Sequence, residues 1–167
     1  MSYVRKPTNE ELRFLRSIMN YQFMIDEADK VITDDVLLRV SKNTGRIRAV
    51  LDGATGKTIA TLVASTHTFN LWLEGGLRLH RVVPKPKLRV IVFNEISDGV
   101  VEAKSTVFAK HVLSIDEDLR SGDEVLVVDE DDNLLCVGRL VLSPDEVMQL
   151  LVGPAVKVRE CVKYESG

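Results

Sequence analysis

The sequence predicts an α+β protein made of two small domains, residues 1–87 and residues 88–167. Three features support this prediction: an amphipathic helix signature near the N-terminus, a series of short β-branched segments separated by turn sequences, and a pair of prolines in mid-chain. Pro84 and Pro86 disfavour helix around them and predict an extended connector, the best candidate for the domain boundary. A chain of 167 residues can bury a sizeable core in one large domain or two small ones.

The first helix is predicted over residues 8–23. Thr8 is a good N-cap, and Glu11, three residues later, completes a capping box. Apolar residues then recur at helical spacing: Leu12, Leu15, Ile18, Met19 and Phe23. The segment is therefore expected to form an amphipathic helix.

An antiparallel meander and a short helix complete the first domain. The meander is predicted from three β-branched or aliphatic segments, at residues 37–41, 46–51 and 58–64. Turn-forming sequences at residues 42–45 and 52–56 separate these segments. A short helix is predicted over residues 74–82, despite two adjacent glycines.

The second domain is predicted to contain more strand than helix. The expected elements are a strand at 88–93, a short helix at 95–103, a strand at Val107–Phe108, a hairpin of 124–128 with 134–141, and a last strand at 155–163. Gly138 permits a bulge or close packing in the hairpin. Between the hairpin and the last strand, Ser143, Pro144 and Glu146 predict the start of a helix, which Gly153 is expected to close.

Composition places the protein among soluble globular proteins, with 45% hydrophobic and 28% charged residues. Its longest apolar runs are only a few residues, so we expect no membrane span, and the polar start is not a signal peptide. We therefore expect a cytoplasmic protein. Cys136 and Cys161 lie in apolar, strand-like segments, where buried thiols are expected rather than a disulfide or metal ligands.

Charge is distributed unevenly along the chain. Residues 1–87 carry 14 Lys and Arg against 9 Asp and Glu, a net +5, whereas residues 88–167 carry 8 against 16, a net −8. The overall net charge of −3 argues against indiscriminate binding to duplex nucleic acid. It does not exclude phosphate binding, which needs only locally clustered cations.

No motif predicts catalysis, a metal or a cofactor. Residues 53–58 end in Gly-Lys-Thr like a phosphate-binding loop, but Leu51 stands where the first glycine belongs, and a strand is predicted where a helix should follow. The three histidines, His67, His80 and His111, are far apart, and no cluster has the spacing of metal ligands. We therefore expect a protein that is not an enzyme.

Two groups of basic residues are candidates for contacts with phosphate. The first lies within twelve residues around the two prolines: Arg78, His80, Arg81, Lys85, Lys87 and Arg89. On the last strand, the two-residue period places Lys157, Arg159, Cys161 and Lys163 on one face, and Val156, Val158 and Val162 on the other. The alternative for each cation is that it belongs to an ordinary solvated face. The sequence pattern does not distinguish such a residue from one that contacts phosphate.

The stretch from Leu88 to Tyr164 carries four short motifs in a characteristic order. They are Val107-Phe108-Ala109, Ser121-Gly122-Asp123, Val137-Gly138-Arg139 and the run from Gly153 to Arg159. In this order they resemble a PUA domain, a small mixed β-barrel, or pseudo-barrel, that binds RNA. The sequence around these motifs includes Leu73-Glu74-Gly75 and Val90-Ile91-Val92. It is most similar to the C-terminal, tRNA-binding portion of archaeal tRNA-guanine transglycosylases. Nothing resembles the catalytic barrel of those enzymes.

The resemblance implies where RNA would bind. PUA domains contact RNA mainly through the segment between their first helix and second strand and through their last strand. Carried onto this chain, those positions are Lys104, Ser105, Phe108, Ala109, Lys110, His111, Lys157 and Arg159. Many PUA domains have glycine where this chain has Lys110-His111, which adds capacity for charge and stacking and puts close approach of the backbone to RNA in doubt. Phe108 is expected in the core rather than on the surface.

The function predicted from these observations is RNA binding without chemistry. The resemblance implies structured RNA as the ligand, tRNA above all, and a free-standing partner or relative of a transglycosylase, which a separate catalytic chain would complement. One alternative is a ribosome-assembly factor that binds ribosomal RNA. Another is a protein-binding adaptor that uses an acidic face formed by residues 116–118 and 129–132.

Overall fold

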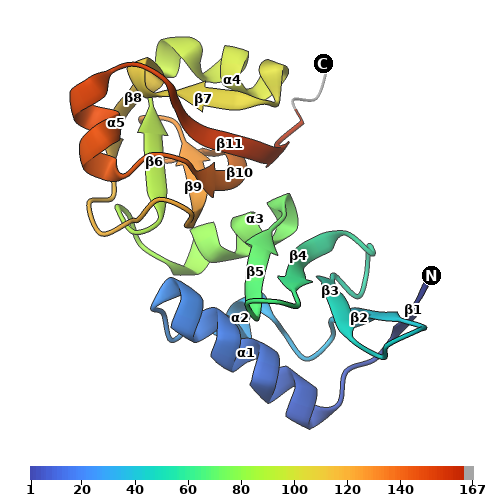
Figure 1. The fold of residues 1–167 in the computed structure, drawn as a ribbon. Coiled ribbons are helices and arrows are strands. Elements are labelled where there is room, and N and C mark those ends of the chain that lie inside the picture. The colour runs from blue at the N-terminus through green and yellow to red at the C-terminus, as the bar shows by residue number, and fades with distance from the viewer. Residues whose placement is uncertain (164–167) are drawn as a thin grey trace. The chain divides into compact units, whose positions relative to one another are not determined.

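The computed structural model of the protein describes residues 1–163, so Tyr164 and the end of the predicted second domain lie outside the described residues. The chain divides into two compact units, Met1–Val83 and Pro84–Gly167 (Figure 1). The division falls immediately before the first of the two prolines. Each unit has its own sheet and its own apolar core.

Unit 1 is built on a five-stranded antiparallel sheet with the strands in sequence order. The strands are β1 (Ser2–Arg5), β2 (Leu37–Ser41), β3 (Ile47–Leu51), β4 (Thr58–Val63) and β5 (Thr68–Leu71). Strands β2 to β4 confirm the predicted meander, whereas β1 and β5 were not predicted. Asp52 and Lys57 are joined by a backbone hydrogen bond of 2.8 Å, and Thr58 begins β4. The Gly-Lys-Thr sequence is therefore part of a hairpin turn.

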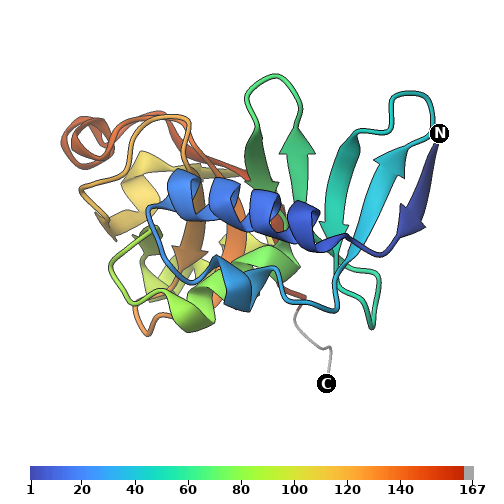
Figure 2. The same cartoon turned by 90° about the horizontal axis from the view of Figure 1, so that it is seen from below.

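Helix α1 (Asn9–Phe23) has the predicted start and the predicted apolar face. The Thr8 hydroxyl accepts a hydrogen bond from the Glu11 backbone at 3.1 Å, and the Glu11 carboxylate accepts one from the Thr8 backbone at 2.9 Å. Figures 1 and 2 show α1 lying along one side of the sheet, on which it buries its apolar residues. Gln22 also bonds the backbone N–H and C=O of Phe69, which protects the edge of β5 from pairing with another chain.

Two further helices complete unit 1, α2 (Ala28–Val31) and α3 (Leu73–Val82). Close packing explains Gly75 of α3, because a Cβ atom there would lie 2.1 Å from the carbonyl oxygen of Ile59 in β4. Only glycine lets the helix approach the strand this closely.

We expect Gly75→Ala to destabilise unit 1 by about 3 kcal/mol, because the methyl group forces the helix away from β4. The change is measured by chemical denaturation followed through the fluorescence of Trp72, which lies beside this contact. Arg13→Ala is the control, because Arg13 is an exposed residue of α1 in the same unit, so the same fluorescence reports its effect. Equal midpoints for the two variants would contradict the close-packing explanation.

Unit 2 contains a curled, mixed six-stranded sheet in the order β7-β11-β10-β9-β6-β8 (Figure 1). Its strands are β6 (Arg89–Val92), β7 (Thr106–Phe108), β8 (Val112–Ile115), β9 (Glu124–Val128), β10 (Leu134–Leu140) and β11 (Pro154–Cys161). All neighbours are antiparallel except β6 and β9, which are parallel. The short helices are η1 (Asn94–Ile96), α4 (Ser97–Ala103), η2 (Ala109–His111) and α5 (Pro144–Leu150).

Three local predictions for this unit were wrong. The connector is not extended: the Lys87 and Arg89 backbone N–H groups bond the carbonyls of Pro84 and Pro86 at 3.2 and 3.0 Å and fold it into turns. Helix α5 starts with the predicted Ser143 capping box but ends before Gly153, because Leu151 takes the left-handed conformation at its C-terminus. Strict alternation in β11 is interrupted at Arg159, since Val158 and Glu160 pair with adjacent residues of β10.

The prediction of two free thiols was also wrong. Cys136 of β10 and Cys161 of β11 face each other across the antiparallel pair and form a disulfide. The sequence shows two apolar strand segments but not their register, and the register is what places the two sulfur atoms together. The same pairing confirms close packing at Gly138, opposite the β11 bulge at Arg159, because a Cβ atom on Gly138 would lie 2.4 Å from the carbonyl oxygen of Lys157.

Candidate nucleic-acid interface

A row of polar side chains crosses the sheet of unit 2. In the strand register Thr106 lies opposite Lys157, Lys157 opposite Arg139, and Arg139 opposite Glu124. Directly opposed residues of antiparallel strands share a face, so these four side chains lie side by side. Lys157 and Arg139 are exposed, whereas Glu124 is buried, with a relative exposure of 4%.

The buried carboxylate of Glu124 holds two arginines in place. The guanidinium of Arg159 bonds both of its oxygens, Nη1 to Oε1 and Nη2 to Oε2, the second at 3.1 Å. Arg139 also lies near this carboxylate, with its Nε atom 3.6 Å from Oε2. A buried carboxylate needs such partners, because an unpaired charge is costly to remove from water. Arg159, predicted to contact RNA, is thus engaged inside the protein.

A pocket of about 240 Å³ opens beside this row. It is lined by Arg139, Lys157, Val158 and Arg159. The three cationic side chains outnumber the one carboxylate beneath them, so the pocket carries net positive charge. Lysine and arginine donors around a concave surface are suited to phosphate oxygens.

The segment before β7 lies beside the same row. The backbone N–H of Val158 donates to the carbonyl of Ser105 at 2.7 Å, which fixes Ser105 next to β11. Lys104 and Ser105 are both exposed, and Lys104 takes the left-handed conformation that ends α4. This bond and the pairing of Thr106 with Lys157 place the Lys104–Ser105 segment next to the strand that carries Lys157, although the two were predicted from separate segments. We call these three residues with Arg139 the basic row.

The other end of β7 differs from the sequence prediction. Phe108 is 43% exposed, so its expected place in the core was wrong; it is the last residue of the short strand β7, where it pairs with Pro154. Its ring makes an edge contact with His111 at 5.9 Å between centroids. Burial, and secondarily the charge of the exposed Lys110, lowers the pKa of His111 below its usual value of 6.5. His111 therefore supplies an aromatic ring and no positive charge at neutral pH.

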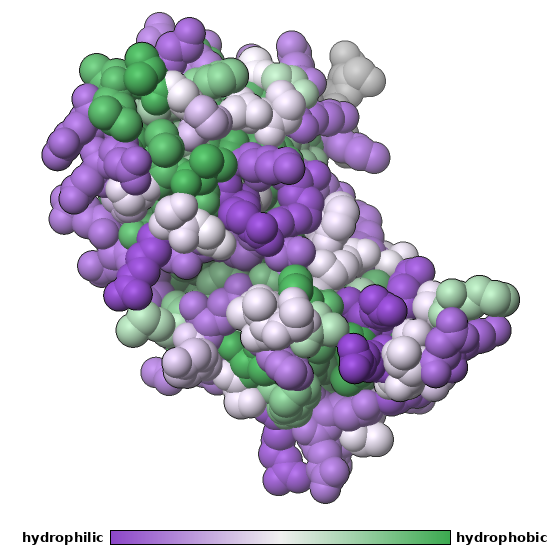
Figure 3. All heavy atoms as spheres, viewed as in Figure 1, coloured by the Kyte–Doolittle hydropathy of each residue, from purple (hydrophilic) through white to green (hydrophobic). Residues whose placement is uncertain are grey.

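An apolar area lies near this end of β7. Helix α5, which packs against η2 and β8, ends in exposed apolar residues: Met148, Leu150, Leu151 and Val152. Figure 3 shows apolar side chains gathering over this part of the molecule. Unit 2 thus presents both a basic row and an aromatic and apolar area, the combination with which proteins contact unstacked nucleotides.

The basic residues around the two prolines have mixed roles. Arg78 of unit 1 bonds Asp52 at 2.6 Å, Glu74 at 3.2 Å and the carbonyl of Val31 at 2.9 Å. Arg89 of unit 2 is 1% exposed and bonds Asp132 at 3.2 Å. Both arginines hold their own units together, and we leave them out of the candidate interface.

The remaining predicted cations lie near the surface but outside the basic row. Arg81, Lys85 and Lys163 are exposed, and Lys87 is half-buried. Arg81 belongs to unit 1, and Lys85 and Lys87 belong to unit 2. Lys163 follows β11, six residues beyond Lys157 and therefore about 20 Å farther along the chain. Arg139, by contrast, was missed; only the pairing of its strand with β11 reveals its place beside Lys157.

Two other findings concern residues 1–163 as a whole. No helix in this range is long and apolar enough to cross a bilayer. Within the same range, no group of three or more His, Cys, Asp or Glu side chains is arranged to hold a metal ion.

Comparison with known families matches each unit separately. Residues 13–86 match the patch-forming domain C2 of tRNA-guanine transglycosylase, and residues 89–162 match the PUA domain. The second unit of the chain contains a PUA domain. Together the two matches follow the two units of the structure and confirm the resemblance found in the sequence.

Individual relatives agree with the family matches. The chain is 39% identical over 153 residues to the tRNA-guanine(15) transglycosylase of Methanothermobacter thermautotrophicus, covering 92% of this chain and 23% of that enzyme. It is 37% identical over 161 residues to the enzyme of Thermococcus kodakarensis, covering 96% and 27%. The chain thus spans about a quarter of the length of the curated relatives it matches, and it corresponds to their C-terminal portion.

Solved structures show the same fold. A hypothetical protein of Pyrococcus horikoshii superimposes with a TM-score of 0.70 at 17% identity, over 98% of this chain and 96% of that one. A conserved PUA domain protein of Thermoplasma acidophilum gives a TM-score of 0.67 at 18% identity, with the same coverage. Both are similar over both units, so the pairing of an α+β unit with a PUA domain recurs in other proteins.

Proposed function

We propose that this protein binds structured RNA in the cytoplasm, tRNA above all, and contributes recognition rather than chemistry to tRNA modification. The observation that carries the proposal is the basic row. It contains three exposed cations on neighbouring segments, Lys104, Lys157 and Arg139, and the last two also line a positively charged pocket. The names of the relatives, which are tRNA-guanine(15) transglycosylases, supply the tRNA part of the proposal.

The partner that we propose is a transglycosylase catalytic chain, because the relatives that this chain matches over about a quarter of their length are transglycosylases. In this arrangement the present chain would hold the RNA while the partner carried out the reaction.

Of the alternatives, a protein-binding role for the acidic face receives little support from the structure. Asp129 accepts hydrogen bonds from the Asp131 backbone and from Asn133, Glu130 accepts one from Asn94, and Asp132 binds Arg89. Through these hydrogen bonds and this ion pair, the carboxylates hold the conformation of the β9–β10 turn. They are therefore less available to a partner than the sequence suggests.

We expect the affinity for a tRNA transcript to fall at least about tenfold between 50 and 200 mM salt, because three phosphate contacts release about three counterions. Titrations at several salt concentrations measure the slope. Flat binding, or none at low salt, would contradict the proposal. Crosslinking in the source cells identifies the RNA, and recovery of ribosomal RNA instead of tRNA would replace the tRNA part of the proposal by the ribosome-assembly alternative.

A further inference from the structure

Unit 1 contains a second pocket that the basic row does not explain. It has a volume of about 330 Å³ and lies where α1, the β2–β3 turn and the β4–β5 turn meet. Figure 2 shows these two turns on the same side of α1. The pocket is lined chiefly by Phe14, Arg46, Ile47, Leu62, Ala64 and His67. Its size falls within the range of sites that hold small organic groups.

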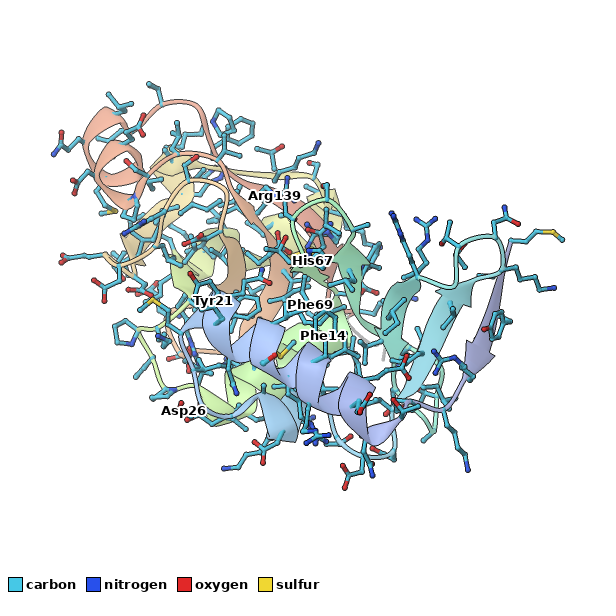
Figure 4. All side chains as sticks on the ribbon, turned by 60° about the horizontal axis from the view of Figure 1, so that its bottom comes forward. Phe14, Tyr21, Asp26, His67, Phe69 and Arg139 are labelled. Carbon is cyan, nitrogen blue, oxygen red and sulfur yellow. A yellow bond between two sulfur atoms is a disulfide. The ribbon has the colours of Figure 1, made fainter. Side chains whose placement is uncertain are left out.

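Two aromatic rings form a corner of this pocket. Phe14 of α1 and His67 of the β4–β5 turn have centroids 6.3 Å apart and planes inclined at 80° (Figure 4). A planar group lying on one ring therefore meets the other ring with its edge. Phe14 remains 47% exposed, although burial of an aromatic ring is favourable, so its face is available to a ligand. The neighbouring Ile47, Leu62 and Ala64 add apolar surface to the wall.

The charge available at the pocket is positive. Glu11 also lines it, but its carboxylate makes a bidentate pair with Arg5, with both N–O distances 2.7 Å, which lowers the pKa of Glu11 to about 2. The exposed guanidinium of Arg46 makes no hydrogen bond or ion pair with the described residues. Unit 1 as a whole carries 12 Lys and Arg against 9 Asp and Glu, a net +3. An anionic ligand is therefore favoured over a cationic one.

We propose that this pocket binds one unstacked nucleobase of the RNA, with the base against Phe14 and His67 and its phosphate near Arg46. An aromatic corner, an apolar wall and one available arginine match the base and the phosphate of a nucleotide, because splayed-out bases are held on aromatic side chains. The inference rests on the proposed RNA-binding function and adds a contact in the first unit. An aromatic side chain of a protein partner would use the same rings but would leave Arg46 without a phosphate.

The test compares two exposed aromatic residues of the same helix. Phe14→Ala removes a ring of the pocket, whereas Tyr21→Ala removes a ring that is 89% exposed and does not line it (Figure 4). We expect Phe14→Ala to weaken binding of a tRNA transcript about tenfold, the effect of losing one base–aromatic stack. Phe14→Tyr, which keeps the ring, and Tyr21→Ala should bind like the wild-type chain. Circular dichroism verifies that each variant is folded.

The outcomes separate the pocket from the overall function. Equal affinities for Phe14→Ala and Tyr21→Ala, with strong wild-type binding, would overturn the pocket and leave RNA binding by the basic row intact. If the wild-type chain does not bind the transcript, the proposed function fails. Whether the pocket binds a nucleotide is then tested separately, by titration with adenosine and uridine monophosphates followed through the amide resonances of Phe14, Arg46 and His67. Shifts caused by an aromatic dipeptide but by neither mononucleotide would assign the pocket to a protein partner and overturn the inference.

Discussion

We expect the double charge reversal Lys104→Glu and Lys157→Glu to weaken binding of a tRNA transcript about 100-fold. Each lysine is exposed and lies in the basic row, on segments joined by the hydrogen bond between Val158 and Ser105. Loss of two charge-assisted contacts, each contributing about 1.5 kcal/mol, accounts for a change of this size. Arg139 is left unchanged, because it also approaches the buried Glu124. The affinity is measured by titration at constant salt.

The matched control is Lys6→Glu with Lys30→Glu. These two lysines are exposed in unit 1 and outside both candidate sites, and the control adds the same negative charge. If binding depended only on the net charge of the chain, both double variants would lose affinity equally. Since exposed charges are screened over about 8 Å at physiological salt, only direct contacts distinguish them. Equal losses would show that the RNA surface is placed wrongly.

The sequence predicted those elements that are encoded by neighbouring residues. The capping boxes at Thr8 and Ser143 each occupy four residues, and the structure contains both as predicted. The meander and the β9–β10 hairpin depend on apolar segments divided by turn residues, which are also local signals. Strand β5 was missed because it has only four residues and follows a turn without a strong glycine or proline signal.

The features that the sequence did not reveal depend on which strands pair. The disulfide, the place of Arg139 and the pairing of Arg159 with Glu124 all follow from the register of β9, β10 and β11. A single cation gives no indication of whether an acidic partner will lie beside it in the fold. Arg159 has such a partner, whereas Lys157, two residues earlier on the same strand, remains exposed. Similar sequence environments thus produced a structural arginine and a candidate RNA contact.

We expect Glu124→Ala to destabilise unit 2 by about 3–5 kcal/mol, the usual effect of removing one member of a buried ion pair. The substitution leaves Arg159, whose side chain is only 17% exposed, without the carboxylate that binds it. Because Trp72 lies in unit 1, the loss is best measured by hydrogen exchange of the buried amides of β9, with the disulfide kept oxidised in all samples. Glu117→Ala is the control, since Glu117 is an exposed carboxylate of the same unit.

The double variant Glu124→Ala with Arg159→Ala tests the cause of this destabilisation. If the effect of Glu124→Ala comes mainly from an uncompensated guanidinium, removing that guanidinium as well should restore part of the lost stability, so the double variant should be more stable than the sum of the single effects predicts. Additive losses would show instead that Glu124 and Arg159 stabilise the unit independently. A loss for Glu124→Ala no larger than that for Glu117→Ala would contradict the buried ion pair itself. In either case Arg159→Ala should weaken RNA binding less than the reversal of Lys104 and Lys157, because its guanidinium bonds Glu124 inside the protein.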